Sequence, residues 1–129
     1  MKWFRRRPRI TDEIYGNLMT SFGRVVDRDP LVKHPAAALA ERVAADGAGL
    51  VAELDRGMYP GATLYHLRLL AGAWIMAREG TVPLQTAEVF EEALVWRFEP
   101  VHRGGGELAR RLSRLARGEG PREGLQPGS

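Results

Sequence analysis

The segment Leu64–Arg78 restricts the fold of this chain more than any other feature. Placed at 100° per residue on a helix, its apolar side chains leave almost no polar face. These side chains are Leu67, Leu69, Leu70, Trp74, Ile75 and Met76. A helix that is apolar nearly all round is normally buried inside a domain. Its longest uncharged apolar stretch is about half the length of a membrane span. We therefore predict a central buried helix at about residues 64–78 and no transmembrane segment.

An amphipathic helix is expected before this segment, at about residues 12–27. Thr11 is a typical N-cap residue, and apolar side chains follow it at helical spacing. A second helix should begin at Pro35, because proline is favoured at the first helical position. Gly47 and Gly49 interrupt its pattern, which leaves open whether they end the helix, kink it or weaken it.

Two further helices are expected after the central one, which Thr63 should cap. Residues 84–98 present an apolar face, with three glutamates on an opposite, solvated face. These are Glu88, Glu91 and Glu92. Gly104–Gly106 should form a flexible joint before a short helix at 107–117. No alternating β-type pattern competes with these helices, so we predict an all-α single domain, a bundle of four to five helices.

Charge divides the chain into unequal parts. Residues 1–10 carry five basic side chains and no acid, whereas residues 101–129 carry a net +3. Because the whole chain is +3, residues 11–100 carry −5. We expect a flexible basic arm at 1–10, a helical core domain at 11–100, the glycine joint and basic helix at 101–117, and a disordered tail at 118–129. Any attraction to a polyanion must come from the two ends.

No grouping of residues points to catalysis. The chain has no cysteine, which excludes thiolate metal ligands and cysteine nucleophiles. Its three histidines are far apart in sequence, and His66 is expected to be hydrogen-bonded in or near the core. Glu99 and His102 have the Glu-x-x-His spacing of carboxylate metal sites, but such sites need a second pair. We therefore predict a non-enzymatic protein with no metal and no cofactor.

The N-terminal arm is the first candidate surface for a partner. Aromatic rings beside arginines are typical of proteins that bind a membrane surface, and also of proteins that bind RNA or single-stranded DNA. The plainer interpretation is a solvated arm whose aromatic residues pack on the bundle. The candidate residues are Trp3, Phe4, Arg5, Arg6, Arg7 and Arg9.

The helix at 107–117 is the second candidate, because its arginines gather on one side and its leucines on the other. Basic amphipathic helices bind membranes, acidic partners or nucleic acid, but they also occur as ordinary last helices of bundles with their charges outward. The candidate residues are Arg110, Arg111, Arg114 and Arg117. If this helix and the arm lie on the same side of the bundle, their charges form one basic surface.

The third candidate is a face of small side chains on the first helix, formed by Gly16, Thr20 and Gly23. A glycine inside a helix costs up to about 1 kcal/mol relative to alanine. That cost favours close packing of another helix on this face, either within the domain, from a second copy or from a partner.

The beginning of the chain resembles a known family. A short start with aromatic residues and arginines precedes a helix that carries Ile14-Tyr15-Gly16-x-Leu18. This order is similar to the opening of the ubiquinol–cytochrome c chaperone family of assembly factors. The resemblance covers about fifteen residues and does not extend to the later motifs of that family, so it assigns no functional residue here.

Together these features predict a cytoplasmic, non-enzymatic helical protein-interaction module, such as an adaptor, accessory subunit or assembly factor. Its partner would be another protein or a second copy of the chain. The alternative is an accessory protein that binds nucleic acid through its basic ends, which would weaken steeply with added salt. A second alternative is peripheral membrane association through the N-terminal aromatic and arginine residues.

Overall fold

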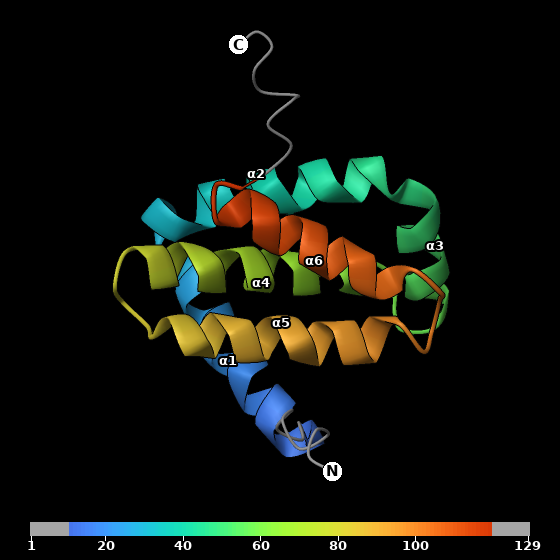
Figure 1. Ribbon diagram of the computed structural model, residues 1–129, viewed down its shortest axis with the longest axis horizontal. Helices are drawn as coiled ribbons and strands as arrows, with labels where there is room; N and C mark the ends of the chain where they lie inside the picture. Colours follow the sequence, from blue (N-terminus) through green and yellow to red (C-terminus); the bar gives the residue numbers. More distant parts are fainter. Residues whose placement is uncertain (1–10, 120–129) are drawn as a thin grey trace, which may run out of the picture.

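The computed structural model describes residues 11–119, and in that range it consists of six α-helices and no strand (Figure 1). They are α1 (Asp12–Arg28), α2 (Pro30–Asp46), α3 (Ala48–Arg56), α4 (Ala62–Arg78), α5 (Leu84–Phe98) and α6 (Gly105–Ala116). The all-α prediction is confirmed, whereas the prediction of four to five helices is wrong. The basic arm at 1–10 and nearly all of the tail at 118–129 lie outside the described residues.

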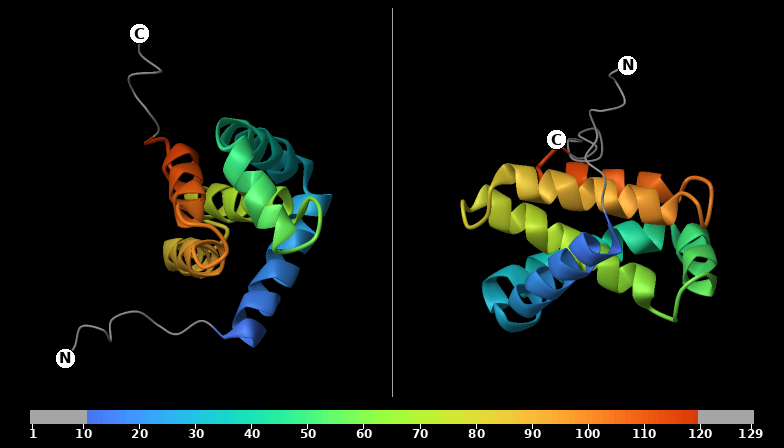
Figure 2. Two further views of the ribbon diagram at one scale, coloured as in Figure 1. Left: turned by 90° about the vertical axis from the view of Figure 1, so that its right-hand side faces the viewer. Right: turned by 90° about the horizontal axis from the view of Figure 1, so that it is seen from below.

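Helix α4 lies at the centre of these elements. It contacts each of the other five helices, and both views in Figure 2 show it enclosed between α5 and α6 on one side and α1 and α2 on the other. Its Trp74 is 1% exposed, and the indole Nε1 donates a hydrogen bond of 2.8 Å to Ser113 Oγ on α6. On another side of α4, a Cβ added to Gly72 would overlap Cγ2 of Val26, so α1 packs closely here.

Helix α2 begins at Pro30, and the predicted start at Pro35 is wrong. Asp29 caps the helix by accepting a 2.9 Å hydrogen bond from the Leu31 N–H. Pro30 occupies the first helical position, where a backbone N–H would have no partner within the helix. Pro35 lies inside the first turns and removes only one backbone hydrogen bond there. Pro30 and Pro35 are both suited to the start of a helix, and α2 begins at Pro30 because the carboxylate of Asp29 caps it there.

Gly47 separates α2 from α3 and accounts for the additional helix. Its backbone leaves the helical conformation (φ −111°, ψ 35°), and the residue is buried against α6. A Cβ on Gly47 would lie only 2.5 Å from Cδ2 of Leu108. Gly49, by contrast, lies within α3 with open space around it. Which glycine ends the helix is therefore set by a contact with α6.

Two carboxylates cap the helices that follow them in the chain. Asp55, in α3, accepts hydrogen bonds from the N–H groups of Gly61 (3.2 Å) and Thr63 (3.0 Å) at the start of α4. Glu99, directly after α5, does the same for Gly104 (3.1 Å) and Gly106 (2.9 Å) at the start of α6. The first N–H groups of a helix have no partner within it and favour negative charge.

These contacts correct two predictions. The N-cap of α4 is Gly61 in the left-handed conformation (φ 82°), and Thr63 is buried inside the first turn. Helix α6 begins at Gly105, so two of the three glycines expected to form a joint belong to the helix itself. A Cβ on Gly105 would lie 2.8 Å from the carbonyl oxygen of Phe98. The glycines at this position permit the close approach of α6 to the end of α5.

Replacing Asp55 by alanine should lower the free energy of unfolding by about 1 kcal/mol, because two N–H groups at the start of α4 lose their acceptor. Urea denaturation followed by circular dichroism measures this loss. Glu53→Ala is the matched control on the same helix: it removes only a surface ion pair with Arg56, worth less than about 1 kcal/mol. A larger loss in the control than in Asp55→Ala would contradict the capping role.

Candidate functional site

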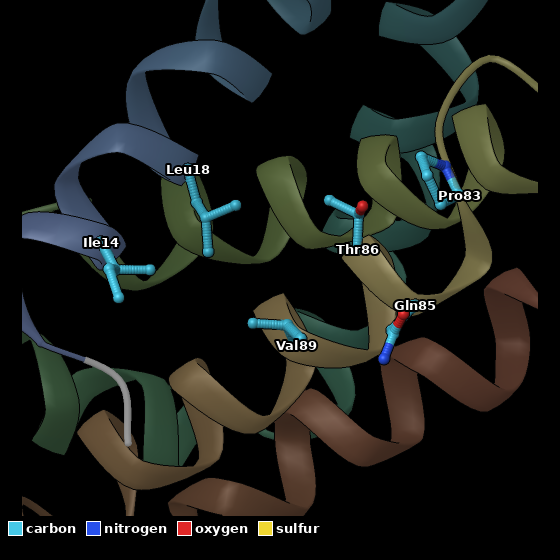
Figure 3. Close-up of a pocket in the computed structure, with 6 residues that line it drawn as sticks. All are labelled: Ile14, Leu18, Pro83, Gln85, Thr86 and Val89. Carbon is cyan, nitrogen blue, oxygen red and sulfur yellow. The ribbon is translucent and has the colours of Figure 1, made fainter. Parts of the chain in front are cut away.

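A groove opens between α1 and the first half of α5 (Figure 3). It encloses about 320 Å³, and most of the side chains that line it are apolar. Figure 3 shows the two α1 side chains on one wall, directed toward those of α5 on the other. The lining residues are Ile14 and Leu18 from α1 and Pro83, Gln85, Thr86 and Val89 from the start of α5.

The groove exists because α1 crosses α5 at an angle instead of lying along it (Figure 2, right). Ile14 is 42% exposed and Leu18 only partly buried, although the apolar stripe of α1 includes both. On α5, Val89 is likewise only partly buried. Helical periodicity predicts that these three residues lie on core-facing sides of their helices, and the diverging helix axes leave them incompletely buried.

One more exposed apolar side chain lies near the end of α5. Trp96 is 58% exposed and lies seven residues after Val89, which places both on the same face of the helix. Beside it, Arg97 forms an ion pair of 3.2 Å with Asp12 and stacks 4.1 Å above the ring of Tyr15. These two contacts hold the start of α1 against the end of α5.

The three small residues predicted to form one face of α1 lie in different surroundings in the structure. Gly23 is buried, and a Cβ there would lie 2.8 Å from the Tyr65 hydroxyl oxygen, so this glycine serves packing against α4. Gly16 and Thr20 are exposed, and nothing lies within 4 Å of a Cβ added to Gly16. Close packing within the domain thus accounts for one of the three predicted residues.

Each of the four arginines predicted as a basic surface on α6 has an acidic neighbour in the same molecule. Arg110 pairs with Glu91 (3.3 Å) and Glu92 (3.2 Å) of α5. Arg117 approaches Glu91 (3.6 Å), pairs with Glu119 (2.9 Å) and stacks 4.8 Å above the Trp74 ring. The remaining pairs are Arg111 with Asp46 (3.1 Å) and Arg114 with Glu107 (2.8 Å). The charge of this helix face is therefore largely balanced by α2, α5 and α6.

Glu91 was expected on a solvated face, and that prediction is wrong. It is 9% exposed and lies between α5 and α6. Burial raises the pKa of Glu91, and the charges of Arg117 and Arg110 act in the opposite direction. Because Glu91 is close in sequence to two other glutamates, the local pattern predicted a solvated face. Its partners, Arg110 and Arg117, come about twenty residues later in the chain.

A second titratable cluster lies where α4 begins. Tyr15 and His66 are 5% and 6% exposed, with ring centroids 5.8 Å apart in an edge-to-face arrangement. The Tyr15 hydroxyl and His66 Nδ1 have no hydrogen-bond partner among the protein atoms, so the hydrogen bond expected for His66 is not formed at Nδ1. The negative charge of Asp55, which caps α4, acts on His66.

Burial sets the direction of the pKa shifts of the two rings in this cluster, Tyr15 and His66. It lowers the pKa of His66 to about 4, with the charge of Arg97 adding to the effect and Asp55 opposing it. Burial also raises the pKa of Tyr15, against the charge of Arg97. For Asp55, partial burial is outweighed by backbone hydrogen bonds from Thr63 and Gly61, so its pKa is lowered. His66 is thus held as a neutral ring under Tyr15 and Phe98.

Among residues 11–119, no three His, Cys, Asp or Glu side chains are grouped so that they could hold a metal ion. Glu99, considered above with His102, instead binds the N–H groups at the start of α6. Within the same part of the chain, no helix has the length and apolar character needed to cross a membrane.

The predicted arm residues Trp3, Phe4, Arg5, Arg6, Arg7 and Arg9 lie outside the described residues. The described chain begins at Thr11, at the start of α1, and Figures 1 and 2 show this point and α6 on different sides of α5. The arm therefore joins the molecule away from the arginines of α6 and beside the α1–α5 groove.

Comparison with known proteins returned no match: no family model fits the chain, and neither curated proteins nor solved structures include one similar to it. The resemblance of the first residues to ubiquinol–cytochrome c chaperones thus receives no support from a family model. The α1–α5 groove and its exposed apolar side chains are the features from which a function can be argued.

Proposed function

We propose that this protein is a non-enzymatic helical interaction module of the cytoplasm, an adaptor, accessory subunit or assembly factor built on a single bundle. The observation that carries the proposal is the α1–α5 groove, whose walls expose Ile14 and leave Leu18 and Val89 only partly buried. An exposed apolar patch with polar residues around it is typical of a surface that binds another protein.

The shape of the groove favours a helix or an extended peptide as the bound element. Two helices that diverge leave a trough into which an amphipathic segment can place its apolar side chains. Thr86 and Gln85 supply polar atoms at one wall, as expected for a site that also orients its partner. The balanced charges on α6 make that helix a less suitable surface for a charged partner.

A photo-crosslinking amino acid placed at Ile14 in the native cell should join the protein to a specific partner. The same amino acid at Ala38, an exposed residue of α2, should give no such product. Val89→Glu should reduce the crosslink from position 14 at least tenfold, because it puts a charge into the apolar wall. Gel electrophoresis and mass spectrometry identify the product.

The outcome is clear in either direction. Identical products from positions 14 and 38, or a product that Val89→Glu leaves unchanged, would contradict the groove as the interaction surface. A product that contains only a second copy of this chain would replace the adaptor role with self-association.

A further inference from the structure

We propose that the α1–α5 groove is the docking site of the chain's own N-terminal arm, with Trp3 and Phe4 seated between the two helices. The arginines that follow this aromatic pair would then lie over acidic residues beside the groove. The arm is outside the described residues, and the argument rests on the surface that the described residues present and on the sequence of the arm.

The groove and the arm match in chemical character. The groove is lined mainly by aliphatic side chains and proline, and the 58% exposed Trp96 lies further along the same face of α5. The arm contains the only two aromatic residues of the first ten, side by side at Trp3 and Phe4. Aromatic side chains lose more water-exposed area on burial than most others, so a short peptide gains most from placing this pair.

The arm also reaches the groove without strain. Ile14, the first groove residue, follows Thr11 by three positions, about 4.5 Å along the axis of α1. Seven to eight residues connect Thr11 to the aromatic pair, and a chain of that length spans up to about 25 Å. The ion pair between Asp12 and Arg97 places the origin of the arm beside α5. So short a tether gives an effective concentration in the millimolar range, which favours the chain's own arm over a second copy.

The charges are complementary as well. The arm carries +5, and the described residues 11–119 carry a net −2. Exposed acids precede one groove residue on each helix, about 100° around the helix from it: Glu13 before Ile14 on α1, and Glu88 before Val89 on α5. Opposite charges at the rim of an apolar contact fix its orientation more than its affinity.

The test uses the full chain, which has no natural cysteine. Arg5→Cys keeps the aromatic pair, and it is combined with Gln85→Cys in the groove. The control combines Arg5→Cys with Thr20→Cys, an exposed α1 position about 200° around the helix from Leu18 and two residues further along. Under mild oxidation, the groove pair should form an intramolecular disulfide at least tenfold faster than the control pair.

Adding Trp3→Ser and Phe4→Ser to both proteins should remove that difference, because the aromatic anchors are lost. Equal rates in the two original pairs would overturn the proposal. So would a preference for disulfide-linked dimers, which would make a second copy the occupant. Because no partner protein is involved, the result is independent of the crosslinking test of the proposed function.

Discussion

Replacing Trp74 by alanine should lower the free energy of unfolding by about 3–5 kcal/mol, a large part of the stability of a domain of this size. The ring is 1% exposed at the centre of the fold, so its removal leaves a cavity among α4 and α6. It also leaves Ser113 without the indole donor and Arg117 without the ring over which it stacks.

Urea denaturation followed by circular dichroism measures the loss without relying on tryptophan fluorescence. Trp96→Ala is the matched control, because the same side chain is removed from a position that is 58% exposed. That variant should lose about 1 kcal/mol or less, as is usual for surface substitutions. Equal losses in the two variants would show that Trp74 does not hold the central position described above.

Acidification from pH 6.5 to pH 4 should remove roughly 3 kcal/mol of stability through His66 alone. In the unfolded chain this histidine titrates near pH 6.5, whereas burial lowers its pKa to about 4 in the folded protein. Between these values the unfolded state binds a proton that the folded state does not. Stability contributed by the neutral ring is therefore complete above pH 6.5 and is lost as the pH falls through this window.

Comparison of the wild type with His66→Gln isolates this contribution, since other groups titrate in the same range. Glu91, whose pKa is raised, acts in the opposite direction above pH 4.5 in both proteins. The difference in unfolding free energy between the two proteins, measured at half-unit steps from pH 7.5 to 4, should shrink toward acid pH. A difference that stays constant would show that His66 is protonated with the same ease in both states.

Much of the fold follows from local sequence patterns. The bounds of α5 agree with the predicted helix at 84–98, and Thr11 caps α1 by accepting a 3.1 Å hydrogen bond from the Ile14 N–H. These features depend on a proline, a capping side chain and helical periodicity within a few residues. The break at Gly47 could not be predicted in this way, because the contact with Leu108 joins residues about sixty positions apart.

The candidate site was less accessible to sequence reasoning. Periodicity shows that Ile14, Leu18 and Val89 share apolar faces, but it does not show the angle at which two helices cross. The role of Glu91 was missed for a similar reason, since its partner Arg110 lies on another helix. A useful signal was present in the arginines of α6, because acids of α2, α5 and α6 could neutralise them.

Because of the capping contacts, the turns between the helices should differ in how well they accept an inserted segment. The α3–α4 and α5–α6 turns each depend on a carboxylate that reaches the next helix, so an inserted segment would separate donor from acceptor. The α4–α5 turn, around Gly80 and Thr81, is exposed, and a Cβ on Gly80 meets nothing within 4 Å. Exposed turns of this kind accept insertions most readily. A reporter domain placed there would stand close to Pro83, at one end of the groove, where it could signal the arrival of a ligand.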